Sequence, residues 1–203
     1  MKTTTIFAAI TAMALSFVGG TASADNFDNT VASVTAEFDR YDVTIEGTEN
    51  GGYTELSFGA DVMSYDITDS ITGELAVSAT RYQADDTYGL GMDYTATYYA
   101  GAFRAWGVAE VEYIAPADDF SEGDFYATPR IGTGYDVTAT TSVWSEVGYT
   151  WNASNDWDTV GGVAELGVDF HVAENITLTP SVVQTFDTSD DEAQLNLSVV
   201  MSF

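Results

Sequence analysis

The chain has 203 residues, no cysteine, one histidine and an excess of acidic residues that gives it a formal net charge of -27. A chain this acidic repels nucleic acid and anionic membrane surfaces, which excludes both as partners. Without cysteine, no disulfide contributes to the fold.

The first 24 residues have the three parts of a secretory signal peptide. A short start contains the basic Lys2, residues 6–18 are apolar, and Ala22-Ser23-Ala24 fits the small-residue pattern of a cleavage site. The apolar run is shorter than the ~20 residues that a membrane-spanning helix needs, which argues against an N-terminal anchor. We therefore expect residues 1–24 to be removed on export and residues 25–203 to form a single domain.

Downstream of Asn26 the chain alternates apolar and polar residues with the period of two that is typical of β-strands. The first stretch, residues 30–45, changes phase midway, so a bulge near Asp39 or an early turn is expected. The turn signal Glu49-Asn50-Gly51-Gly52 follows. The other alternating stretches are residues 55–62, 71–80, 89–98, 103–113, 125–137, 143–151, 165–172, 176–186 and 194–203. An even count, here ten, is what a closed up-and-down barrel with both termini at one end requires.

The connections alternate along the chain between short turns and acidic segments. Two chemically different ends imply that the ends of the barrel face different compartments. Aromatic residues recur beside the short turns, as in the girdle of a barrel at a membrane interface. These residues are Tyr65, Tyr99, Tyr135, Phe170 and Phe203. Pro129 and Pro180 fall inside strands, where each removes a hydrogen-bond donor, so a bulge is expected at each.

The final strand carries the clearest resemblance to a known family. Its apolar residues alternate and end on an aromatic in Val199-Val200-Met201-Ser202-Phe203, and with the signal peptide, the strands and the two kinds of connection the chain resembles bacterial outer-membrane β-barrel proteins. The ending is similar to that of small porins, and the size is nearer to OmpA/OmpX-type barrels. The resemblance implies an all-β, closed antiparallel up-and-down transmembrane β-barrel of about ten strands, with eight as the alternative. It also implies a place among the lipids of the outer membrane of a Gram-negative bacterium, with Phe203 as the signal read by the barrel-assembly machinery.

The alternative is a soluble barrel of the lipocalin type, in which the apolar face would point inward around a ligand. The polar face would then carry several glycines into solvent, although small residues suit the crowded interior of a narrow barrel. These glycines are Gly59, Gly89, Gly91, Gly132, Gly148 and Gly167. The membrane barrel is therefore the preferred interpretation.

Charged residues on the polar face would then lie in the lumen. Pairing the strands around the acidic segment at Asp118 sets Glu110 opposite Arg130 and Arg104 opposite Asp136, and the next hairpins bring Glu146 and Glu165 nearby. We hypothesise that Glu110, Arg130, Glu146 and Glu165 form one ionic network. Buried charges must be paired, so the network is consistent with a plugged, non-conducting structural or surface-interaction barrel. The preferred interpretation is that the surplus acids favour cations in a narrow water-filled path, which predicts a porin-like channel for small cationic solutes, with the plugged barrel as the alternative.

Two further chemistries receive less support. Carboxylates in the acidic segments are possible ligands of divalent cations, but they lack the spacing of a defined calcium loop, so a solvated charge run is favoured. These carboxylates belong to Asp118, Asp119, Asp190 and Asp191. The only histidine, His171, belongs to a short turn at the end opposite the long loops, where outer-membrane enzymes do not place their sites. We therefore expect no catalytic residue and no cofactor.

Overall fold

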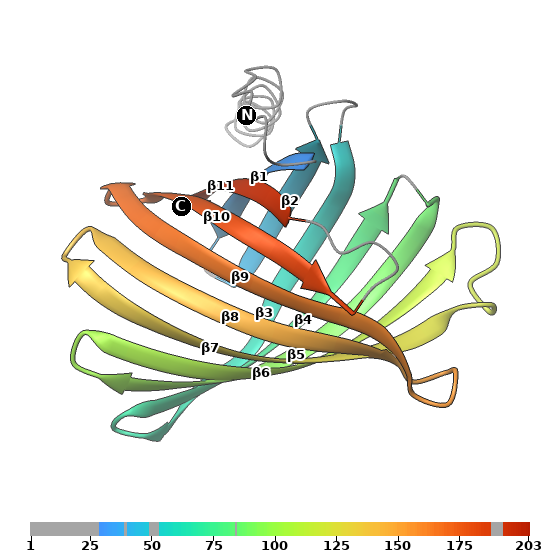
Figure 1. Ribbon diagram of the computed structural model, residues 1–203, viewed down its shortest axis with the longest axis horizontal. Helices are drawn as coiled ribbons and strands as arrows, with labels where there is room; N and C mark the ends of the chain where they lie inside the picture. Colours follow the sequence, from blue (N-terminus) through green and yellow to red (C-terminus); the bar gives the residue numbers. More distant parts are fainter. Residues whose placement is uncertain (1–28, 39, 49–52, 84, 188–192) are drawn as a thin grey trace.

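The chain forms a closed β-barrel in the computed structural model, which describes residues 29–38, 40–48, 53–83, 85–187 and 193–203 (Figure 1). The strands are β1 (Asn29–Phe38), β2 (Tyr41–Thr48), β3 (Tyr53–Thr68), β4 (Ile71–Tyr82), β5 (Thr87–Ala100), β6 (Phe103–Pro116), β7 (Asp124–Thr138), β8 (Thr141–Asn152), β9 (Asp158–Ala173), β10 (Ile176–Phe186) and β11 (Ala193–Ser202). The described part of the chain has no helix long and apolar enough to cross a membrane. The expected signal peptide, residues 1–24, lies outside the described ranges.

The all-β class and the closed barrel are confirmed, with eleven strands in the described ranges where about ten were expected. The extra strand comes from residues 30–45, where the change of phase marks a reversal of the chain. Phe38 pairs with Tyr41 across it, so an early turn is present rather than a bulge. Each strand pairs antiparallel with the next, but β1 closes the barrel by pairing parallel with β11, for example Ala36 with Met201. The expectation of an even, wholly antiparallel barrel was wrong at this seam.

The two ends of the barrel differ, as the sequence pattern predicted. At one end, two residues link β3 to β4, β5 to β6, β7 to β8 and β9 to β10. Gly101, in the link after β5, has a φ of +65°, a conformation that glycine adopts without steric cost. At the other end, longer segments join Pro116 to Asp124 and Asn152 to Asp158.

The two prolines inside strands cause no register shift, so the expected bulges are absent. The pairing of β7 with β8 keeps one register on either side of Pro129, and the pairing of β10 with β9 does the same around Pro180. Each proline pairs normally on its other side, Pro129 with Ala109 and Pro180 with Leu197. The missing backbone N–H of each proline therefore interrupts the pairing with one neighbouring strand only and does not bend the strand.

The two faces of the strands separate apolar from polar residues. Large apolar side chains point outward and are about half exposed, such as Met92, Ile131 and Leu166 at 51%, 66% and 61%. Tyr65, Tyr135, Phe170 and Phe203 are also exposed at the end with the short turns. Tyr99 is an exception to the expected girdle, because it lines the interior while its neighbour Tyr98 is in phase with outward-facing Met92.

An apolar cluster closes the outer surface of the seam. Val34 and Ala36 of β1 and Val199 and Met201 of β11 are buried against one another. They alternate with Ser33, Asn196 and Ser198, which line the interior, so the cluster lies on the outward face of the two strands. Phe38 and Phe203 stack beside it with ring centroids 5.3 Å apart. Side-chain packing thus supports the parallel pair that completes the barrel.

Candidate functional site

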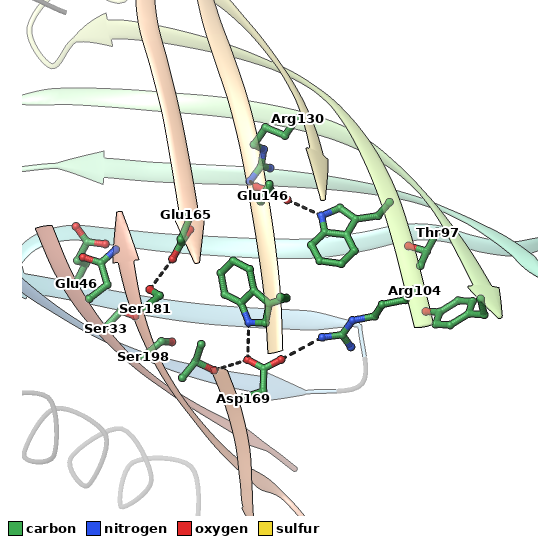
Figure 2. A pocket seen from close by; sticks show the side chains of 15 residues that line it. Ser33, Glu46, Thr97, Arg104, Arg130, Glu146, Glu165, Asp169, Ser181 and Ser198 are labelled. Atoms are coloured by element: carbon green, nitrogen blue, oxygen red, sulfur yellow. Dashed lines mark hydrogen bonds and ion pairs between the residues drawn. The ribbon is translucent and has the colours of Figure 1, made fainter. Parts of the chain in front are cut away.

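The lumen contains a cavity of about 550 Å³, within the size range of small-molecule sites. Figure 2 shows its side chains converging from strands on several sides of the barrel. Four carboxylates and two guanidinium groups line it, together with two indole rings. The charged residues are Glu46, Glu146, Glu165, Asp169, Arg104 and Arg130. Carboxylates therefore outnumber cationic groups in the cavity.

Arg130 of β7 bridges two carboxylates from the neighbouring strands. Its Nη2 lies 3.1 Å from Oε2 of Glu110 on β6, and its Nη1 lies 3.2 Å from Oε1 of Glu146 on β8. The Nε1 group of Trp106 donates a 2.5 Å hydrogen bond to the other oxygen of Glu146. Two negative charges and one positive charge leave this group with a formal charge of -1.

The indole rings fit because glycines face them across the strands. Trp106 pairs with Gly132, and a Cβ atom at Gly132 would overlap the indole ring. Trp144 pairs with Gly167 in the same way. Glycine on the inward face is therefore required by the close approach of large aromatic side chains.

Asp169 of β9 is the centre of a second cluster (Figure 2). Its Oδ2 lies 3.1 Å from Nη2 of Arg104 on β6 and accepts a 3.1 Å hydrogen bond from Ser142. Its Oδ1 accepts hydrogen bonds from Nε1 of Trp144 at 3.0 Å and from Thr179 at 2.9 Å. Because β7 and β8 separate β6 from β9, the contact between Arg104 and Asp169 spans the curved wall of the barrel rather than adjacent strands.

The structure brings together only part of the network expected from the sequence. Glu110, Arg130 and Glu146 are in contact, whereas Glu165 pairs with Glu146 across the strands and accepts a 2.6 Å hydrogen bond from Ser181. The register between β6 and β7 differs from the expected one by two positions: Glu110 faces Thr128, and Arg104 faces Gly134. An even offset keeps the same side chains inside, so Arg130 still contacts Glu110 and Glu146 in the lumen, whereas Arg104 contacts Asp169.

Arg104 and Asp136 are the expected pair that does not form. Both line a hollow of about 430 Å³ near the short turns, but no ion pair joins them, and Arg104 binds Asp169 instead. Asp169 was missed as a partner because it is distant in sequence and three strands away. Its position on the polar face of β9, in phase with Glu165, was the available signal.

The opposite part of the lumen contains carboxylates without arginines. We call the inward carboxylates of β2 to β5 the acid wall, and the group on β6 to β9 that contains Arg104, Arg130, Glu110, Glu146 and Asp169 the arginine wall. The acid wall consists of Asp42, Glu46, Glu55, Asp61, Glu74 and Asp93. Among the described residues, no ion pair joins an acid-wall carboxylate to an arginine. Neighbouring acids interact repulsively there, as Glu55 does with Glu46.

The acidic loop after β6 is locally structured. Asp119 accepts a 2.6 Å hydrogen bond from the Ser121 hydroxyl and a 3.0 Å bond from its backbone amide. The hydroxyl bond, with the amide bond second, lowers the pKa of the Asp119 carboxyl below its usual range. Within the described ranges, no group of three or more potential ligands is arranged to hold a metal ion. Asp118 lies in the same loop, while Asp190 and Asp191 lie outside the described residues.

His171 occupies the short-turn end of β9, as expected. Its Nδ1 lies 2.9 Å from the Thr177 hydroxyl on β10, and the ring borders the hollow that Arg104 also lines. This contact is local to the hairpin between β9 and β10.

Comparison with known proteins identifies the fold. The crystal structure of the NanC porin in a rhombohedral crystal form superposes with a TM-score of 0.63 and 10% sequence identity, covering 84% of this chain and 91% of the porin chain. No protein-family model and no curated protein sequence matches the chain. The chain therefore has a porin-like barrel fold.

Proposed function

We propose that this protein is an outer-membrane barrel that forms a narrow channel for small cationic solutes. The observation that carries the proposal is the excess of carboxylates over arginines in the lumen of a barrel with a porin-like fold. Rings of acidic side chains in a pore lower the energy of cations and raise that of anions.

The outward face supports a membrane location. Side chains such as Met92, Ile131 and Leu166 are more than half exposed in the isolated barrel, and each would expose apolar area to water. Lipid would cover them, while aromatics such as Tyr135 and Phe203 would occupy the interface at the short-turn end. A soluble barrel would instead place these residues inside.

The charge distribution supports cation selectivity. The arginine wall is nearly balanced, since Arg104 is offset by Asp169 and Arg130 by Glu110 and Glu146. The acid wall has no such compensation. A cation that follows the lumen past Asp61, Glu74 and Asp93 meets repeated favourable charge, while an anion is repelled.

Conductance in a planar lipid bilayer tests the proposal. We expect small single-channel steps and, across a KCl gradient, a reversal potential of the sign that cation selectivity requires. The test variant combines Glu74→Gln and Asp93→Asn on the acid wall. The control variant carries Glu174→Gln at a short turn. The first should reduce selectivity and the second should not. Silence of the folded barrel, or anion selectivity, would contradict the proposal.

A non-conducting barrel is the second candidate, favoured by the side chains that occupy the lumen. The large side chains in the lumen bind carboxylates of β6, β8 and β9 and reduce the open cross-section of the barrel. They belong to Arg104, Arg130, Trp106 and Trp144. If this network is a plug, the double variant Arg104→Ala, Arg130→Ala should conduct while the unmodified barrel stays silent. Conductance of the unmodified barrel removes this candidate.

A further inference from the structure

The part of the cavity next to the β1–β11 seam differs from the arginine wall. Glu46 of β2 and Glu165 of β9 both line it, and neither makes an ion pair with another described residue. The surface around them is formed by the inward faces of β1, β11, β10 and β9 (Figure 2). These two carboxylates are half-buried and line the same cavity. Arg130 attracts Glu165 electrostatically but is held in ion pairs by Glu110 and Glu146.

Neutral polar side chains form two neighbouring inward-facing rows between the strands that carry the two carboxylates. Glu46 pairs with Ser33, Ser33 with Ser198, and Ser198 with Thr179. The next inward-facing row pairs Asn196 with Ser181, whose hydroxyl donates to Glu165. All of these residues line the cavity. The surface therefore offers hydrogen-bond acceptors and donors without adding positive charge.

An aromatic surface lies beside this region. Trp144 packs over Gly167, which is two positions from Glu165 on the inward face of β9. Its Nε1 group is held by Asp169, which keeps the ring in a fixed orientation inside the cavity. Aromatic rings attract organic ammonium groups through their negatively polarised faces.

The chemistry of the region selects one class of ligand. Anions are disfavoured because both lumen arginines are already held by carboxylates. A multivalent metal ion is usually held by several charged ligands, and the described residues contain no group of three or more Asp, Glu, His or Cys side chains placed to hold one. A neutral molecule would leave two partly desolvated carboxylates uncompensated. An ammonium group carries the missing charge and three hydrogen-bond donors, and its organic part fits against the indole.

We propose that the cavity beside the seam binds small organic amines in their ammonium form, with Glu46 and Glu165 as the residues that determine specificity. The site deepens the proposed channel function by naming the class of cation, and it rests on that function for its role in transport. The aromatic and hydroxyl surfaces distinguish it from a simple path for hydrated potassium ions.

Calorimetric titration of the complete barrel, refolded in detergent, tests the site with two probes of the same shape. Benzylammonium should bind, and benzyl alcohol, which lacks the charge, should bind at least about tenfold more weakly because a charge-assisted contact is lost. Tryptophan emission should change only with benzylammonium, since Trp106 and Trp144 line the cavity.

Variants then locate the binding. Glu46→Gln and Glu165→Gln should each weaken benzylammonium binding about fivefold to tenfold, and the double variant should abolish it. Glu174→Gln, at the short turn outside the cavity, is the matched control and should leave binding unchanged. A heat-shifted band on an SDS gel verifies that each variant is folded. If folded Glu46→Gln is not obtained, the same measurement on Glu165→Gln decides.

Two results would overturn the site: equal binding of the two probes, or full benzylammonium binding by the folded double variant. The outcome is separable from that of the channel. A barrel that conducts potassium but does not bind benzylammonium retains the channel and loses the site. A barrel that binds benzylammonium but never conducts retains the site as a receptor and loses the channel.

Discussion

The carboxylates of the arginine wall are paired with donors and arginines, whereas those of the acid wall have no ion pair among the described residues. Asp169 on the arginine wall accepts four hydrogen bonds or ion-pair contacts, while Glu55 on the acid wall has only like charges as its electrostatic neighbours. Partners around a carboxylate replace the water that it loses on burial. The arginine wall is therefore suited to stability, and the acid wall retains unsatisfied charge for which a passing cation is the natural partner.

The largest effect is expected from Asp169→Ala. This change leaves Arg104, Trp144, Ser142 and Thr179 without their shared acceptor, and we expect it to lower the free energy of unfolding by roughly 2–4 kcal/mol. Urea unfolding of the barrel in lipid vesicles measures it. The control Asp136→Ala removes an exposed acid that makes no ion pair and should change stability little. Equal effects of the two changes would mean that the cluster does not stabilise the arginine wall.

A smaller loss of stability is expected where a tryptophan ring lies over a glycine. In Gly132→Ala the added methyl group overlaps the ring of Trp106, which must move and weaken its bond to Glu146. We expect a loss of roughly 1–3 kcal/mol, the usual range for overpacking. Gly107→Ala on the same hairpin is the control, because its Cβ would meet only a backbone oxygen at 3.9 Å. The same unfolding assay should separate them, and a destabilised Gly107→Ala would contradict the packing explanation.

Removing a charge from the acid wall should instead increase the stability of the barrel. Glu55→Gln removes a charge that Glu46 and Glu112 repel, so we expect a gain of roughly 0.5–1 kcal/mol in unfolding free energy at neutral pH. Glu146→Gln, a matched change on the arginine wall, should instead destabilise the barrel because it weakens the contacts to Arg130 and Trp106. If both variants shift stability in the same direction, the distinction between the walls fails.

The smallest effect is expected outside the barrel wall, in the loop above β6 and β7. Ser121→Ala removes the hydroxyl bond that holds the pKa of Asp119 down, so that pKa should rise toward its ordinary value. Because the folded-state pKa is lowered, the charged Asp119 carboxyl stabilises the loop at pH values above its unfolded-state pKa. This contribution is lost as the pH falls through the folded-state pKa, below about 4. NMR titration of the Asp119 carboxyl measures the shift. Ser121→Thr keeps a hydroxyl, and a normal pKa in that variant would show that the hydroxyl is not the cause.

Alternation alone carried much of the fold prediction. A period of two determines which residues share a face, so the inward positions of Glu110, Arg130 and Glu146 followed from the sequence even with the register between β6 and β7 wrong by two. The same reasoning missed the separate first strand, since a change of phase is compatible with either a bulge or a turn. It also expected bulges at Pro129 and Pro180 that the pairing does not contain.

What the sequence determined by itself was the class of fold, the two faces of the strands and the surplus of acid inside, because these depend only on residue type and alternation. The tertiary structure decided which charges meet. Closure of the barrel brings Asp169 to Arg104 across two intervening strands, and it leaves Glu46 and Glu165 beside the seam with no ion pair to a described residue. Such contacts depend on register and curvature, which no local pattern in the chain encodes.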